Sequence, residues 1–249
     1  MTEIFAHRGS CRLARENTVA AFLAARELGA DGIELDVHFT ADGEVVVHHD
    51  AELPGLGPIR RLSATELPEW LPTLTEALEA CRPLRVNVEI KQAEGDSGPE
   101  LDQSLAFAVA RLLASRSEAP NVVVSSFSLL AVDTVLASKP SLATALLVGH
   151  GENPMHALET ARRHGHRGLH PFFLSVDEAL VGAAKAAEMA IRTWTVDEPA
   201  RIASLAEMGV DAVITNDVTA ARQALGRFDG PVDPSPPSKP VDPSPPRST

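Results

Sequence analysis

The stretch VVVSSFSLLAVDTVLASKPSLATALLV, residues 122–148, sets the pattern of the fold. A short apolar run at 122–126 is followed by a helical segment at 129–137 and a second apolar run at 142–148. Short apolar runs separated by a helix are typical of strands buried on both faces. This order therefore predicts a parallel sheet covered by helices.

The same alternation extends in both directions along the chain. Further strands are expected at 4–6, 31–37, 84–91, 168–171, 190–196 and 212–215. Further helices are expected between Asn17, a possible helix cap, and Gly29, then at 73–81, 100–116, 154–164, 176–187, 199–208 and 218–225. Eight strand–helix units, with one extra hairpin strand at 44–48, predict a (βα)8 TIM barrel with a short insertion after the second strand.

Two segments fall outside this alternation. Residues 50–72 are irregular and rich in proline and glycine, so we interpret them as the small insertion. Residues 229–249 carry the run Pro-Val-Asp-Pro-Ser-Pro-Pro twice and have almost nothing apolar to bury. We expect one barrel domain over 1–228, followed by a disordered proline-rich tail.

Composition narrows the function. The formal net charge of −12 argues against binding to nucleic acid or to an anionic membrane surface. Only Cys11 and Cys81 are present, which is too few for a disulfide framework. No apolar run is long enough for a membrane anchor and no signal peptide is recognisable, so a cytoplasmic protein is expected. The sequence leaves the oligomeric state open.

Strand alternation places acidic side chains inside the predicted barrel. Glu34 and Asp36 share one face of their strand, while apolar residues take the outward face that helices must cover. Glu89 and Lys91 share a face of the third strand in the same way. Three converging carboxylates would repel, and a hard cation such as Mg²⁺ or Ca²⁺ would relieve this. The alternative is an internal Glu89–Lys91 salt bridge without a metal.

Histidines follow two of these strands. His7 ends the first strand and His49 follows the hairpin strand, so the pair could act as general acid and general base. Arg8 offers a bidentate fork for a phosphate oxygen, or alternatively an ion pair with Asp36 or Glu34. Weaker candidates are His38 and His170. His48 is expected to be an ordinary surface or core histidine, and four others are expected to be solvated: His150, His156, His164 and His166.

A family resemblance rests on motifs that lie in one collinear order over residues 4–225. The sequence resembles the glycerophosphodiester phosphodiesterase (GDPD) family. The matching segments are Phe5-Ala6-His7-Arg8-Gly9, Glu16-Asn17-Thr18, 29–37, Thr40-Ala41-Asp42-Gly43, 45–50, Pro72-Thr73-Leu74, Val88-Glu89-Ile90-Lys91, Ser125-Ser126-Phe127, Trp194-Thr195-Val196 and 209–217.

The resemblance implies a TIM barrel and a role for each matching residue. It implies a divalent metal held by Glu34, Asp36 and Glu89, and His7 and His49 as the acid–base pair. It further implies that Arg8 and Lys91 bind phosphate and that Trp194 lines the pocket. Trp194 could instead fill the barrel top without touching ligand.

The activity implied is hydrolysis of glycerophosphodiesters, such as glycerophosphocholine or glycerophosphoethanolamine, to an alcohol and sn-glycerol 3-phosphate. The sequence departs from the family at 51–57, where Ala-Glu-Leu-Pro-Gly-Leu-Gly replaces a Thr-Leu-x-Arg-Thr-Thr-type run, which leaves the substrate range open. The alternatives are a phospholipase-like activity on lysophospholipids or phosphoinositides, and a non-catalytic barrel that binds phosphoesters.

Overall fold

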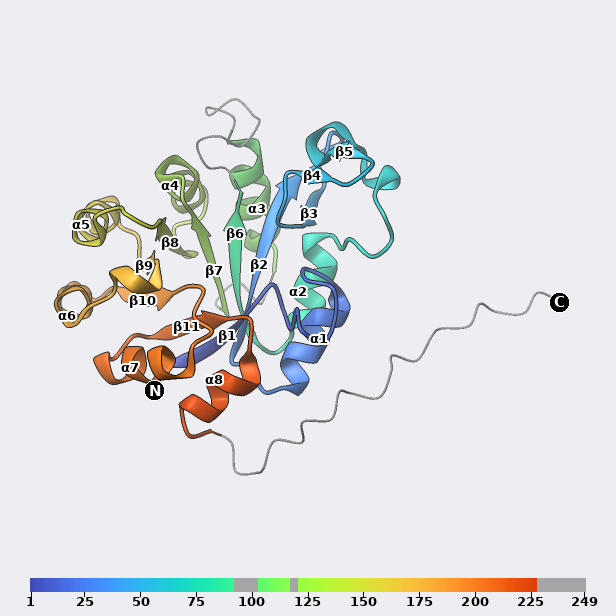
Figure 1. Ribbon diagram of the computed structural model, residues 1–249. Coiled ribbons are helices and arrows are strands. Elements are labelled where there is room, and N and C mark those ends of the chain that lie inside the picture. Colours follow the sequence, from blue (N-terminus) through green and yellow to red (C-terminus); the bar gives the residue numbers. More distant parts are fainter. Residues whose placement is uncertain (92–102, 117–120, 228–249) are drawn as a thin grey trace.

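The computed structural model describes residues 1–91, 103–116 and 121–227, and its strands form a closed barrel (Figure 1). Parallel pairing runs in the order β1-β11-β10-β9-β8-β7-β6-β2, and β2 pairs with β1 to close the ring. The barrel strands are β1 (Glu3–His7), β2 (Gly32–Phe39), β6 (Arg85–Ile90), β7 (Val122–Ser126), β8 (Ala143–Val148), β9 (Gly168–Pro171), β10 (Ala190–Thr193) and β11 (Ala212–Thr215). The TIM-barrel prediction is confirmed.

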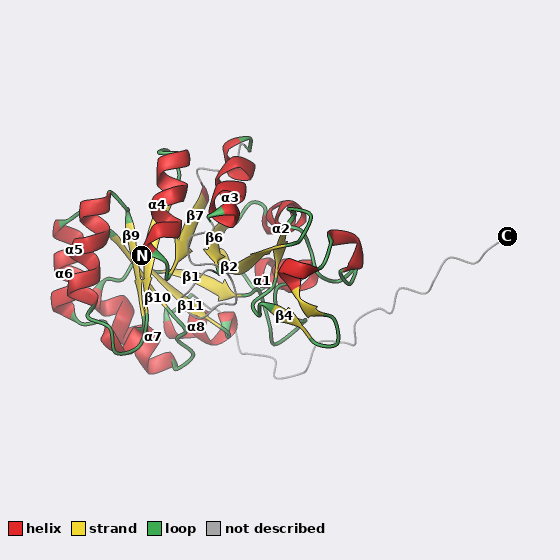
Figure 2. Cartoon of the chain, turned by 90° about the horizontal axis from the view of Figure 1, so that it is seen from above, coloured by secondary structure: helices red, strands yellow, loops and turns green. Residues whose placement is uncertain are grey.

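Helices lie around the outside of the strands, as the view in Figure 2 shows. They are α1 (Val19–Glu27), α2 (Leu74–Cys81), α3 (Ser104–Ala114), α4 (Leu129–Ser138), α5 (Pro154–His164), α6 (Glu178–Ala186), α7 (Pro199–Met208) and α8 (Val218–Ala224). Outward-facing strand residues such as Ile33, Leu35 and Val37 join the helices in the main hydrophobic core. The alternation of β2 therefore turns Glu34 and Asp36 into the barrel.

The insertion after the second strand has a small core of its own. Strand β3 (Val45–Val47) pairs antiparallel with β2, and β4 (Glu52–Leu53) pairs with β5 (Gly57–Pro58). The short 3₁₀ turns η1 (Ile59–Arg61) and η2 (Ala64–Glu66) follow. Val46, Leu53, Ile59 and Leu71 pack together beneath this segment. The predicted insertion is confirmed.

Three local expectations differ from the structure. Asn17 is not a helix cap: Thr18 caps α1 through its side chain, while Asn17 adopts a positive φ of 56° and is fully buried. His166 is not solvated, because only 3% of its surface is exposed. The strand expected at 190–196 ends at Thr193, which leaves Trp194 just beyond β10.

Some expectations fall on residues outside the described ranges. The proline-rich tail at 229–249 and the start of the helix predicted at 100–116 are among them, and the division of the chain at residue 228 stays a prediction. Among the helices in the described part of the chain, none is long and apolar enough to cross a membrane.

Candidate active site

Three carboxylates meet inside the barrel because of strand register. Asp36 of β2 lies opposite Glu89 of β6, and Glu34 lies opposite His7 of β1. Their ligand atoms lie within 4.8 Å of one another, and all three residues are buried. The convergence predicted from alternation is therefore present at the carboxyl ends of neighbouring strands, where the active sites of TIM barrels lie.

Two cations partly balance this charge. Lys91 Nζ lies 2.9 Å from Asp36 Oδ1 and 2.6 Å from Glu89 Oε1. Arg8 Nε lies 3.3 Å from Asp36 Oδ2, while its Nη1 donates to Glu16 Oε1 at 2.9 Å. Both ion pairs weighed as alternatives to ligand binding are thus formed. The ion pairs alone do not decide between a purely structural role and phosphate binding for Arg8 and Lys91. A phosphate site also needs its cationic side chains held in place.

The balance between burial and nearby positive charge differs among the three carboxyl groups, and so do their pKa values. Burial raises the pKa of Glu34 well above its usual range, and the charges of Asp36 and Glu89 add to this. Burial also raises the pKa of Glu89, to about 7, despite Lys91 beside it. Burial opposes the charged form of Asp36 too, but Lys91 and Arg8 outweigh it and lower its pKa. The positive charge near Glu34 and Glu89 is therefore too small to offset the cost of burying their carboxylates.

A divalent cation fits this deficit. Glu34 Oε1 is buried and accepts no hydrogen bond from any described residue. Such an atom is costly in a folded protein unless a partner neutralises it. The donor set consists of oxygen atoms alone, which Mg²⁺ and Ca²⁺ prefer over Zn²⁺. Glu34, Asp36 and Glu89 thus form a candidate metal centre.

A chain of hydrogen bonds orients His7. Its Nδ1 lies 2.7 Å from Asn216 Oδ1, and Asn216 Nδ2 donates to Asp197 Oδ2 at 2.8 Å. Because the Asp197 carboxylate accepts only, the Asn216 amide must present its oxygen to His7. Nδ1 of His7 therefore carries the proton, and Nε2 offers its lone pair 3.9 Å from Glu34 Oε2. Burial and the Arg8 charge lower the pKa of His7, which favours this neutral form.

His49 is held in a similar way on the insertion side. Its Nδ1 lies 2.7 Å from Asp50 Oδ1, and its backbone carbonyl lies 3.0 Å from His38 Nε2. The His49 side chain is about one-third exposed, so solute can reach it. His48 differs: its ring packs edge-on against Trp70, 5.9 Å between centroids, as expected for a structural histidine.

The loop after β1 has an unusual backbone. Arg8 and Gly9 adopt positive φ values of 57° and 80°, and a Cβ at Gly9 would lie 2.7 Å from the backbone carbon of Ala21. Asn17 donates its backbone N–H to the Arg8 carbonyl at 2.9 Å, and its Nδ2 donates to Asp36 Oδ2 at 2.8 Å. Non-glycine residues at positive φ are uncommon and concentrate at functional sites.

Aromatic residues line another side of the mouth. Trp194 packs edge-on against Phe127 and Phe172, with centroids 5.5 and 5.7 Å apart. Its Nε1 donates to the His170 carbonyl at 2.8 Å, so the indole N–H is already used. Trp194 also packs against Phe5, Ala212 and Ile214 in the barrel interior. Trp194 is only partly buried, and its contact with ligand stays a prediction.

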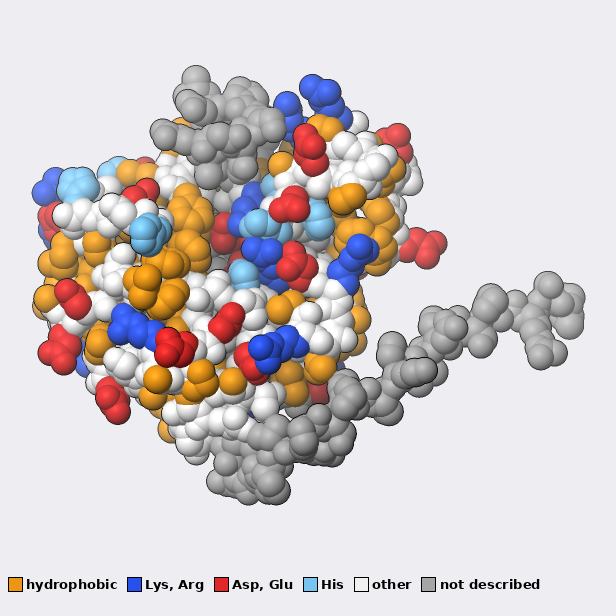
Figure 3. Space-filling model, viewed as in Figure 1, with side chains coloured by type: hydrophobic (Ala, Val, Ile, Leu, Met, Phe, Trp, Pro, Cys, Tyr) orange, Lys and Arg blue, Asp and Glu red, His pale blue; other side chains and the backbone are white. Residues whose placement is uncertain are grey.

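Charged and histidine side chains also gather on the molecular surface. Acidic, basic and histidine side chains gather near the centre of the face in Figure 3, with hydrophobic side chains beside them. His170, a weaker candidate, is fully buried inside the barrel, where burial lowers its pKa well below the usual value.

Sequence reasoning missed three residues that orient the site: Asn17, Asn216 and Asp197. Asn17 and Asn216 stand inside matched motifs but were given no role in the active site. Their contacts join residues 19 and 209 positions apart, so no local pattern could assign them. Asp197 follows β10 and carried no spacing signal at all.

A protein-family model identifies the family of this chain. The model of the glycerophosphoryl diester phosphodiesterase family matches residues 7–220. The chain belongs to this family. It is therefore a hydrolase of the phosphodiesterase class. The match includes every residue of the carboxylate cluster and both histidines of the candidate site.

Individual relatives agree. The chain is 33% identical over 237 residues to a glycerophosphodiester phosphodiesterase of Caldanaerobacter subterraneus subsp. tengcongensis, covering 87% of this chain and 94% of the relative. It is 27% identical, with a TM-score of 0.80, to an Oleispira antarctica phosphodiesterase solved with its product sn-glycerol-3-phosphate, covering 91% and 97% of the two chains. A glycerophosphodiester phosphodiesterase of Parabacteroides distasonis is also 27% identical, with a TM-score of 0.79 and coverage of 90% and 97%.

Proposed function

We propose that this chain hydrolyses glycerophosphodiesters, such as glycerophosphocholine or glycerophosphoethanolamine, to an alcohol and sn-glycerol 3-phosphate. The observation that carries the proposal is the juxtaposition of an oriented histidine with three buried carboxylates: His7 Nε2 faces Glu34 at 3.9 Å within the cluster. The family match and the relative solved with sn-glycerol-3-phosphate support the same substrate class.

In this proposal Glu34, Asp36 and Glu89 hold Mg²⁺ or Ca²⁺, which supplies Lewis acidity to a phosphoryl oxygen when bound. Arg8 and Lys91 border the carboxylates and bind the phosphate. Arg8 has N–H donors beyond those directed at Glu16 and Asp36, and a guanidinium suits bidentate contact with phosphate oxygens. Residues 51–57 and Trp194 border the leaving group and set the substrate range.

The two histidines move protons at defined atoms. His7, neutral and protonated at Nδ1, accepts a proton from the nucleophile at Nε2, with Asn216 holding the ring. His49 donates a proton from Nε2 to the leaving alkoxide, and the Asp50 carboxylate, 2.7 Å from Nδ1, holds the ring. The nucleophile is either a glycerol hydroxyl of the substrate or water, and detection of a cyclic phosphate product would separate the two.

The test is a panel of soluble diesters assayed in parallel with Mg²⁺ and with Ca²⁺, with release of glycerol 3-phosphate as the readout. We expect turnover that EDTA abolishes and either or both cations restore. Lysolipid vesicles serve as the comparison substrate, and a preference for them would favour the phospholipase-like alternative. Full activity in EDTA would overturn the metal assignment, and binding without turnover in metal-replete protein would favour the non-catalytic alternative.

A further inference from the structure

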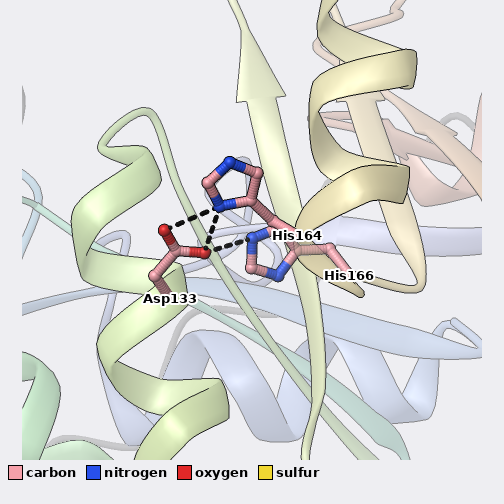
Figure 4. A group of neighbouring side chains, drawn as sticks. All are labelled: Asp133, His164 and His166. Carbon is pink, nitrogen blue, oxygen red and sulfur yellow. Dashed lines mark hydrogen bonds and ion pairs between the residues drawn. The ribbon is translucent and has the colours of Figure 1, made fainter.

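A second group of side chains that could hold a metal ion lies outside the barrel, between α4 and α5 (Figure 4). It consists of Asp133 from α4, His164 at the last position of α5, and His166 just before β9. One ligand atom from each lies within 4.8 Å of the others. Because His166 precedes β9 and its partner Thr144 lies near the start of β8, the group lies toward the opposite end of the strands from the carboxylate cluster.

The three side chains converge on one point. His164 Nδ1 lies 3.0 and 2.9 Å from the two Asp133 oxygens, and His166 Nε2 lies 3.0 Å from Asp133 Oδ1. The two imidazole rings stack with their planes 16° apart. Gly165, at a positive φ of 84°, ends α5 between them, and this turn lets both histidines face Asp133.

These separations suit a coordination sphere. In a tetrahedral site with metal–ligand bonds of about 2.0–2.1 Å, neighbouring ligand atoms lie roughly 3.3 Å apart. The observed nitrogen–oxygen distances are 2.9–3.0 Å, so small shifts would open space for an ion. Asp133 and His164 lie in helices, and His164 is substantially exposed, so an ion can enter from solvent.

The environment of His166 gives a second reason to consider a cation here. Its side chain is completely buried, and its Nδ1 lies 2.9 Å from Thr144 Oγ1. Its Nε2 lies 3.0 Å from Asp133 Oδ1, but the pair lacks the geometry of a regular hydrogen bond. Donation from Nδ1 to Thr144 would leave a buried Nε2 lone pair beside a carboxylate, an arrangement that a cation relieves.

We propose that Asp133, His164 and His166 form a second metal site, selective for a transition-metal dication such as Zn²⁺, with a remaining position open to water. Two imidazoles and one carboxylate favour Zn²⁺ and its neighbours over Mg²⁺ and Ca²⁺. The ion would tie α4 to the end of α5, so its role would be to stabilise the fold. This site does not depend on the proposed activity.

Metal-free full-length protein tests the proposal by Zn²⁺ titration in saturating Mg²⁺. We expect the wild-type chain to bind one more equivalent of Zn²⁺ than His164→Ala or Asp133→Asn. His156→Ala is the matched control, because it removes an exposed histidine from the same helix outside the group. The Tm should rise with Zn²⁺ in wild type and control, and this increment should be lost in both cluster variants.

Two further readouts keep the result unambiguous. Co²⁺ in place of Zn²⁺ should give visible absorption bands that the His164→Ala variant lacks. Diester hydrolysis in Mg²⁺ should be unchanged in both variants, which would show that they fold. Equal Zn²⁺ stoichiometry in wild type and His164→Ala would overturn the proposal and leave a hydrogen-bonded His–Asp–His group without a metal.

Discussion

The carboxylate cluster at the barrel mouth and the Asp133–His164–His166 group each bring three ligand atoms within 4.8 Å. They are built in different ways. At the mouth, parallel strand register fixes Asp36 opposite Glu89, and the barrel permits little movement. Outside the barrel, helix packing and one glycine turn bring the ligands together. Strands therefore hold the group proposed for chemistry, and helices hold the group proposed for stability.

The charges differ as much as the scaffold. The mouth has three buried carboxylates against Lys91 and Arg8, and Arg8 is shared with Glu16. The outer group has one carboxylate and two imidazoles. An excess of buried negative charge calls for a hard cation, whereas neutral nitrogen ligands call for a softer one. Both groups have three ligands, but the different ligand types predict different metals and different effects of substitution.

The same substitution in both groups should give the largest contrast. Asp36→Asn should lower kcat/KM for glycerophosphodiester hydrolysis on the order of 10³-fold, because it removes a metal ligand and leaves Lys91 and Arg8 without their shared partner. Asp133→Asn should leave it within about 2-fold. Glycerol 3-phosphate release measures both, with circular dichroism to verify folding. Equal losses in the two variants would refute the division of roles.

Histidine substitutions should separate proton transfer from metal binding. His7→Ala and His49→Ala should each lower kcat by about 10²–10⁴-fold, the usual contribution of a positioned acid or base. Binding of Mg²⁺ or Ca²⁺, followed by calorimetry, should persist. His164→Ala is the control from the outer group and should retain kcat. Retained kcat in the His7 and His49 variants would remove them from the proposed mechanism.

Metal-dependent stability should follow the two donor sets. At 100 times its Kd, Mg²⁺ or Ca²⁺ should raise the free energy of unfolding by about 2.7 kcal/mol. The increment should disappear in Glu34→Gln, which loses the buried Oε1 that has no hydrogen-bond partner among the described residues, and should survive in Asp133→Asn. Urea unfolding with and without the cation gives the increment. Its loss in Asp133→Asn would contradict separate sites.

The backbone of the mouth should also be less tolerant of change. Gly9→Ala should cost about 2 kcal/mol more than Gly55→Ala, because overpacking adds to an unfavourable φ. The two glycines have nearly equal φ values, +80° and +81°. A Cβ added at Gly9 would lie 2.7 Å from the Ala21 backbone, whereas a Cβ at Gly55 would have no described atom within 4 Å apart from its chain neighbours. Urea unfolding compares them. Equal costs would show that the contact with Ala21 adjusts freely.

The sequence was sufficient for the elements of the barrel. The bounds predicted for α5, β9 and β11 agree with the structure, because buried strands and helices carry periods that nearby residues reveal. Alternation likewise placed Glu34, Asp36 and Glu89 on inward faces. It could not give the register that sets Asp36 beside Glu89, since pairing between strands depends on the whole closed sheet.

Only the tertiary structure determined the contacts between distant segments. Asn17 reaches Asp36 through a turn held by Gly9, and Asn216 orients His7 from 209 residues away. His166 was expected in solvent, yet packing of α4, β8 and α5 buries it against Asp133. A short-range pattern records which face of an element is apolar. Which polar atoms meet across two elements follows only from how they pack.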